Sequence, residues 1–337
     1  MFNVTSLSNI ALASPNDWPS LLTSLGTLDK PLVFKGLVEH WPLVTLAKRS
    51  TKEAIELLQQ DAVAAPLTVY HIGPEDDGKV FYDEHFTGFN YRVLQGSFAQ
   101  LAQQLTGDQN RVQRGSYYLG STLVDRYFPT IDKSHELSVE FNKPLKSLWL
   151  GGKSKVPAHN DYPLNLVCNV IGKRRFVLFP PNEVSNLYIG PLEKTPSGRP
   201  ISLVDLNYPD FDRFPLFQNA LANAQYVDLE PGDALFIPSM WWHYVEGLEH
   251  VNGQINYWWR EDSPACMAHD ALSLALIAVR DLPEHEKSAW KALFNHYVFE
   301  TNDFEHIPAH LKGILSKPNT QAAQELKYNL AAKLSRR

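Results

Sequence analysis

The stretch 157-PAHNDYPLNLVCNVIGKRRFVLFPP-181 contains two short, largely apolar runs that each end at glycine or proline. LNLVCNVI at 164–171 is followed by Gly172, and RRFVLF at 174–179 is followed by two prolines. Short runs of this kind, bounded by turn residues, are typical of strands. The stretch therefore predicts two consecutive strands inside a β-structure.

Further runs of the same kind lie on both sides of this stretch. SLWLGG, AQYVDLEPGDALFIP and GQINYWW are rich in β-branched or aromatic residues. The turn residues EPGD at 230–233 predict a hairpin over 225–238. Several short strands at this spacing favour an antiparallel barrel of the jelly-roll type over 116–262. A segment at 183–224, rich in Pro, Asp and Asn, reads as a long insertion between strands, with a short helix at FQNALANA.

The flanking regions have a different character. Residues 1–115 read as a mixed α/β part packed on the barrel, with strands at PLVFKG and PLTVYHI. Helices are expected after the capping box that starts at Ser50 and from Ser97 to Gly107. From 263 to 337 the pattern becomes helical, with Ser263 as an N-cap. The helix ACMAHDALSLALIAVRDL is apolar on most faces, so it must pack against another protein surface. The barrel or a second copy of the chain would provide it.

Composition narrows the classes of function. The chain has 337 residues, of which 44% are hydrophobic and 20% charged, with a net charge of −6. No block of like charges indicates nucleic acid or an anionic membrane as a partner. No apolar run is long enough to span a bilayer, and the N-terminus lacks a secretory signal, so we expect a cytoplasmic protein. Cys168 and Cys266 are too few for a disulfide framework.

Two residues of the opening stretch suggest a metal site. His159 and Asp161 are two positions apart on a predicted strand, so both side chains would point to the same face. The pair is a weak signal by itself. His243 follows in SMWWHYV, 243 − 161 = 82 residues later. Two histidines and one carboxylate are the ligand set of non-haem Fe(II) oxygenases, although zinc also accepts it.

A cation in the same stretch is also informative. Alternation in the run 174–178 puts Arg174 on the same face as Phe176 and Leu178, whereas Arg175 shares the other face with Val177. An arginine among inward apolar residues needs an anion, and the distal carboxylate of 2-oxoglutarate would be suitable. The alternative is that Lys173, Arg174 and Arg175 are all solvated at a strand end.

Together, these motifs resemble those of the JmjC/cupin-like Fe(II)/2-oxoglutarate oxygenases, in particular the asparaginyl hydroxylase that modifies hypoxia-inducible factor. The resemblance is dense over 115–260, in YYLGSTL, PAHNDYPLNLVCNVIGKRRFVLFPP, NYPDFDRFPLFQNA, EPGDALFIPSMWWHYVE and INYWW. It extends more faintly to PLVFKGLVEHWP. It implies a cupin barrel, Fe(II) as cofactor and 2-oxoglutarate as co-substrate. The helices after 263 resemble the dimerisation region of that hydroxylase, which implies a homodimer.

The resemblance also assigns roles to individual residues. His159, Asp161 and His243 match the iron ligands. The residues that match the co-substrate site are Tyr118, Asn165, Arg174, Asn256 and Trp258. Two positions depart from the pattern. Arg174 stands where that hydroxylase has a lysine, which keeps the charge but changes the geometry. Val156 stands where a threonine normally hydrogen-bonds the co-substrate, so one contact is missing.

The expected function is therefore hydroxylation of a protein side chain or a small molecule. Two other functions stay open because a fold does not fix a function. One is a metal-dependent cupin enzyme that does not use 2-oxoglutarate, which the missing threonine supports. The other is a non-catalytic cupin that only binds a partner. Three convergent metal ligands argue against a non-catalytic binding protein.

Overall fold

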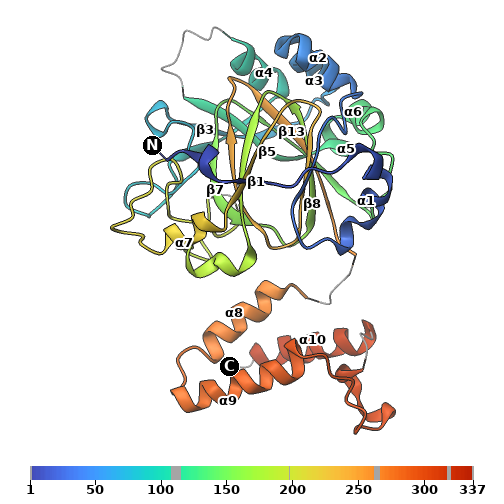
Figure 1. Cartoon of the computed structure of the whole chain (residues 1–337), viewed down its shortest axis with the longest axis vertical. Helices are drawn as coiled ribbons and strands as arrows, with labels where there is room; N and C mark the ends of the chain where they lie inside the picture. The colour runs from blue at the N-terminus through green and yellow to red at the C-terminus, as the bar shows by residue number, and fades with distance from the viewer. Residues whose placement is uncertain (1, 108–114, 197, 262–265, 317–319, 336–337) are drawn as a thin grey trace. The chain divides into compact units, whose positions relative to one another are not determined.

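The computed structural model describes residues 2–107, 115–196, 198–261, 266–316 and 320–335 (Figure 1). The chain divides into two compact units, Met1–Glu261 and Asp262–Arg337. The first unit holds both sheets. Their strands are β1 Ser8–Asn9, β2 Leu32–Phe34, β3 Leu67–Ile72, β4 Tyr91–Gly96, β5 Ser116–Leu123, β6 Leu145–Gly151, β7 Lys155–Asn160, β8 Leu164–Ile171, β9 Arg174–Phe179, β10 Gln225–Leu229, β11 Ala234–Ile237, β12 Trp242–Gly247 and β13 Asn252–Trp259.

The strands form two mostly antiparallel sheets. One has five strands in the order β1-β10-β9-β12-β7, and the other has eight in the order β2-β11-β8-β13-β6-β5-β3-β4. Neighbouring strands in these orders are mostly distant in sequence, as in a jelly roll. The predicted class, a mainly β jelly-roll barrel with helical additions, is confirmed. Residues 1–115 contribute β1 to β4 to the same two sheets.

Side-chain alternation divides the core into layers. On β9, Phe176 and Leu178 belong to the apolar cluster inside the barrel, whereas Val177 and Phe179 pack in a second cluster with α7 (Phe217–Ala222). The third and largest cluster joins the outer face of the eight-stranded sheet to the N-terminal helices. These helices are α1 Trp18–Ser24, α2 Pro42–Arg49, α3 Thr51–Asp61, α4 Phe98–Thr106, α5 Val124–Tyr127 and α6 Pro129–Ser134.

Most of the predicted elements are present. The hydroxyl of Ser50 accepts a hydrogen bond from the Glu53 backbone at the start of α3, and Ser97 and Gln100 form a capping box at α4. The predicted hairpin over 225–238 is wrong. β10 pairs with β9, whereas β11 pairs with β2 and β8 in the other sheet. The turn residues do reverse the chain, but the turn connects a strand of one sheet to a strand of the other. β10 and β11 each pair with strands more distant in sequence and not with each other.

The second unit is helical. It contains α8 (Ala268–Ala278), α9 (Glu284–Phe294) and α10 (Thr320–Leu334). The start predicted at Ser263 lies outside the described residues, and α8 begins at Ala268. Phe304 is the single buried residue in the described part of this unit. Within the described part of the chain, no helix combines the length and the apolar character that crossing a bilayer requires.

Candidate metal centre

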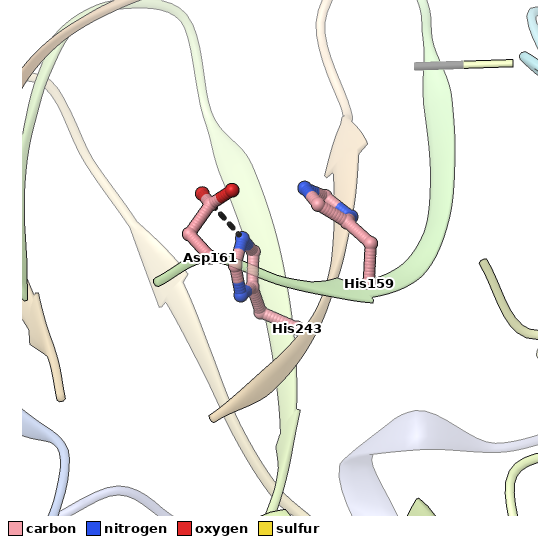
Figure 2. A group of neighbouring side chains, drawn as sticks. All are labelled: His159, Asp161 and His243. Atoms are coloured by element: carbon pink, nitrogen blue, oxygen red, sulfur yellow. Dashed lines mark ion pairs between the residues drawn. The ribbon is translucent and has the colours of Figure 1, made fainter. Parts of the chain in front are cut away.

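His159, Asp161 and His243 come together at one end of the barrel. His159 lies on β7 and pairs directly across the sheet with His243 on β12, and Asp161 follows the end of β7. One potential ligand atom from each residue lies within 4.8 Å of the others. The three side chains point toward one another in Figure 2. The register of two adjacent strands thus joins residues that are far apart in sequence.

Backbone carbonyls fix the orientation of both imidazoles. His159 Nδ1 lies 2.9 Å from the carbonyl oxygen of Pro157, and His243 Nδ1 lies 3.0 Å from that of Trp241. A carbonyl can only accept, so each Nδ1 carries the proton and each Nε2 keeps its lone pair. Burial, together with the nearby His159, lowers the pKa of His243 to about 4. The neutral imidazole that metal binding requires is therefore the stable form near pH 7.

The segment around Asp161 is held by the turn before β12. The backbone N–H of Met240 donates to the Asp161 carbonyl at 2.9 Å, and the Ser239 hydroxyl donates to the Tyr162 carbonyl at 2.5 Å. The Asp161 carboxylate lies 3.7 Å from His243 Nε2 and 3.6 Å from Arg199 Nε. Two imidazoles and one carboxylate that leave further positions open suit Fe(II).

Arg199 reaches this site from the insertion. The next residues of the insertion contact β7, because Ser202 N–H donates to the Ala158 carbonyl at 2.7 Å and Ile201 forms an isolated bridge with His159. These contacts place Arg199 beside the Asp161 carboxylate. Our reading of the sequence did not include Arg199, because an irregular insertion has no periodicity from which to infer where a side chain points.

One cavity of about 260 Å³ connects these residues to the interior of the barrel. All eight residues predicted for the site line it: Tyr118, His159, Asp161, Asn165, Arg174, His243, Asn256 and Trp258. Val156 also lines the cavity and supplies no hydroxyl there. Tyr70, Trp149, Gln254 and Arg199 are additional lining residues. Gln254 was within reach of sequence reasoning, because alternation puts it on the same face as Asn256 and Trp258.

Arg174 marks another part of this cavity. Its side chain is only 1% exposed, and Nη2 donates to the Asn252 carbonyl at 3.2 Å. The Tyr118 hydroxyl is its other hydrogen-bond partner, and burial raises the pKa of Tyr118, which keeps that hydroxyl protonated. No acidic side chain in the described residues forms an ion pair with Arg174, and its Nε has no partner. The predicted inward orientation is confirmed, whereas Arg175 pairs with Asp228 on the other face.

A buried guanidinium without an acidic partner suits an anionic ligand. Burying a charge without a counter-charge is costly, and a bidentate carboxylate is the ligand that matches arginine best. The cavity therefore combines a ligand set for a metal with a cationic anchor for an acid. A cupin-type barrel with this internal site is the class of protein that the fold and the site define.

The comparison with protein families agrees with this class. Residues 21–264 match the model of the cupin-like domain, and the chain belongs to that family. The chain is 36% identical over 156 residues to HSPB1-associated protein 1 of Homo sapiens, which covers 44% of this chain and 31% of that protein. The aligned region is thus about a third of the length of that relative.

Two other relatives come from Dictyostelium and Xenopus. JmjC domain-containing protein D of Dictyostelium discoideum is 37% identical over 120 residues, covering 35% of this chain and 24% of that protein. Lysine-specific demethylase 8 of Xenopus tropicalis is 25% identical over 235 residues, covering 68% of this chain and 48% of that protein. The relatives support a JmjC oxygenase in general, without singling out the asparaginyl hydroxylase.

Proposed function

We propose that this chain is an Fe(II)- and 2-oxoglutarate-dependent oxygenase that hydroxylates a protein side chain or a small molecule. The observation that carries the proposal is one cavity lined both by the His159, Asp161 and His243 triad and by Arg174, a buried guanidinium whose Nε has no partner in the described residues. The JmjC relatives support the same chemistry. A resemblance to the asparaginyl hydroxylase remains part of the proposal.

In this proposal each protein group has a separate task. His159, Asp161 and His243 hold the iron, and Arg174 and Tyr118 hold the distal carboxylate of 2-oxoglutarate. Asn165, Asn256 and Trp258 line the space between them. The buried walls limit the access of water to the reacting groups. Bound iron supplies the activation of dioxygen, which is the chemistry that amino-acid side chains cannot perform.

The overall reaction balances without another reductant. 2-Oxoglutarate loses carbon dioxide and becomes succinate, and it supplies the two electrons that dioxygen needs beyond those of the substrate C–H bond. One oxygen atom enters succinate, and the other converts the substrate C–H into C–OH. When the hydroxylated carbon is a methyl group on nitrogen, the product N–CH2OH breaks its C–N bond, releasing formaldehyde and leaving N–H. The chemistry therefore includes demethylation as well as stable hydroxylation.

The test is release of labelled carbon dioxide from 2-oxoglutarate by the purified chain with Fe(II) and ascorbate. Slow release without a prime substrate is expected, and His159→Ala should abolish it. His285→Ala is the matched control, because this histidine is exposed in the second unit. Iron binding without any carbon dioxide release would contradict the proposal and favour a cupin enzyme of another class, which the missing hydroxyl at Val156 also favours. Absence of metal binding would favour a non-catalytic binding protein.

We also propose that the chain forms a homodimer through its C-terminal helices. Trp290, Leu293 and Phe294 are between 37% and 45% exposed and follow the i, i+3, i+4 spacing of one face of α9. Tyr297, in the π-helical turn Asn295–Phe299 that follows, is 51% exposed. An apolar face of this kind is normally covered. A second copy offers an identical face, so the contact would be closed and symmetric.

The cellular setting is part of the same proposal. Both cysteines are free, Cys168 buried and Cys266 exposed, as suits the reducing cytoplasm. With a net charge of −6, we expect a protein or small-molecule substrate rather than nucleic acid or a membrane.

A further inference from the structure

Three side-chain amides form a row along one wall of the cavity. Gln254 Nε2 donates to Asn256 Oδ1 at 2.8 Å, and Asn256 Nδ2 donates to Asn165 Oδ1 at 3.0 Å. Asn165 is close in sequence to Asp161, at the metal end of the barrel. Gln254 is two residues from Asn252, whose carbonyl accepts the hydrogen bond from Arg174. The row therefore runs from the candidate metal ligands toward the buried guanidinium.

Arg174 and Gln254 line the same cavity, and each has a buried polar atom without a partner in the described residues. Arg174 Nε, Gln254 Oε1 and Asn169 Oδ1 are all buried without a hydrogen-bond partner in the described residues. Gln254 and Asn169 are directly opposite one another in the register of β13 and β8, so their side chains share a face. Asn169 Nδ2 is already used, because it donates to the carbonyls of Gly172 and Leu229.

One donor and two acceptors remain unpaired, and this set does not suit a carboxylate. A carboxylate offers only acceptors, so it would pair with Arg174 Nε but would face the acceptor Gln254 Oε1. A buried polar atom without a partner is costly. The arrangement therefore needs a change before an acid can bind favourably.

Turning all three amides over replaces the unpaired acceptor of Gln254 with a donor and leaves Arg174 Nε for a ligand. The oxygen and nitrogen of a side-chain amide are similar in size, so a half-turn of the amide keeps its shape. After the turn, Asn165 donates to Asn256 and Asn256 donates to Gln254, so both bonds of the row are kept. Gln254 Nε2 then takes the position of Oε1. Its protons are then available to a ligand in the cavity that Gln254 lines.

We propose that Gln254 is a third anchor for the distal carboxylate of 2-oxoglutarate, beside Arg174 and Tyr118, and that the amide row is reversed in the complex. The inference rests on the proposed function, because it needs an acid with a second carboxylate at this end of the cavity. It assigns a ligand contact to a residue outside the set that the sequence predicted. It also gives the amide row a task in selecting the co-substrate.

The test compares two acids that differ only at the distal end. 2-Oxoglutarate carries the second carboxylate, and 2-oxopentanoate has the same chain length with a methyl group there. Calorimetry measures the binding of each acid to the full chain loaded with Mn(II). Gln254→Met keeps the length of the side chain and removes the donors, so 2-oxoglutarate should bind roughly tenfold more weakly. Gln254→Glu adds a negative charge and should weaken binding further. Neither variant should change the affinity for 2-oxopentanoate.

Matched controls come from an exposed glutamine. Gln95 lies on the outer strand β4 and donates to Thr68 Oγ1, and its change to Met or Glu should leave both affinities unaltered. Mn(II) affinity and the unfolding midpoint report whether each variant is folded. If Gln254→Met does not fold, Gln254→Thr replaces it in the same comparison.

The outcomes separate the inference from the function on which it rests. If the unaltered chain prefers 2-oxoglutarate and the Gln254 variants keep that preference, the inference is overturned. Equal losses for both acids indicate a structural role for Gln254 and also overturn it. If the unaltered chain shows no preference for 2-oxoglutarate over 2-oxopentanoate, the proposed co-substrate is wrong and the inference falls with it.

Discussion

Among the described residues, the two units of the chain differ in which side chains lack a partner, buried polar ones in the first and exposed apolar ones in the second. Inside Met1–Glu261, buried polar atoms such as Arg174 Nε have no partner in the described residues. In Asp262–Arg337, apolar side chains such as Trp290 and Phe294 are exposed, and only Phe304 is buried in the described part. An unpaired polar interior calls for a small polar ligand, whereas an uncovered apolar face calls for another protein surface. Changes in one unit should therefore affect ligand binding, and changes in the other should affect association.

The largest effect is expected at Arg174. Arg174→Leu removes the buried cation, so the concentration of 2-oxoglutarate that gives half-maximal carbon dioxide release should rise by about 100-fold. Arg175→Leu is the control, because the neighbouring arginine faces Asp228 on the other side of β9. Sedimentation should show that both variants keep the association state of the unaltered chain. Equal saturation of all three proteins would remove Arg174 from the co-substrate site.

The second-largest effect is expected at Phe294, in the second unit. Phe294→Asp puts a charge into the exposed apolar face of α9, so the dissociation constant of the dimer should rise at least tenfold. Analytical ultracentrifugation over a range of concentrations measures it. Ser288→Asp, an exposed position on the same helix outside the face of 290, 293 and 294, should leave association unchanged. Carbon dioxide release should be similar in both variants, and a loss of release in Phe294→Asp would show that the units are not functionally separate.

A moderate effect of pH is expected from His135, a buried polar group near α2. Burial lowers the pKa of His135 to about 4, and its Nε2 accepts a hydrogen bond from the Leu43 backbone. The unfolded chain therefore takes up this proton more readily than the folded one. The stabilising contribution is complete above about pH 6.5 and decreases as the pH falls toward 4, by at most about 1.4 kcal/mol per pH unit.

Urea unfolding at pH 7.5, 6 and 5 measures that slope. His135→Gln keeps an acceptor for Leu43 but cannot titrate, so stability should fall less steeply with acid than in the unaltered chain. His243 contributes to the remaining slope, because burial lowers its pKa as well. His285→Ala, in the second unit, should leave the slope as it is. An unchanged slope in His135→Gln would contradict the role given to His135.

The smallest effect is expected at Val156. Val156→Thr adds the hydroxyl that the resemblance to the asparaginyl hydroxylase implies at this position, so 2-oxoglutarate should saturate at a concentration a few-fold lower. Val93→Thr on the exposed strand β4 is the control, because Val93 is 58% exposed. A rise in the required concentration would show that this cavity is adapted to an apolar side chain at 156.

Most of what the sequence could predict came from the alternation of side chains between the two faces of a strand. It placed His159 and Asp161 on one face, and it separated the inward Arg174 from the outward Arg175. It failed at 225–238, because turn chemistry at EPGD reports a reversal but not which strands pair. Arg199 lies in an irregular insertion, where only tertiary contacts such as that of Ser202 with Ala158 decide its position. The unpaired atoms of the amide row also became visible only in three dimensions, since a sequence does not record hydrogen bonds.

The position of β7 in its sheet has a consequence for the order of assembly. β7 carries His159, and among the described residues it pairs along its length only with β12 and otherwise makes isolated bridges at Lys79 and Ile201. A metal ion shared by His159 and His243 would act as a clamp that closes a long chain loop and fastens the outermost strand of the smaller sheet. Chelation would release that clamp first. We therefore expect amide hydrogens of β7 to exchange faster in the metal-free protein, while the central strand β8 stays protected.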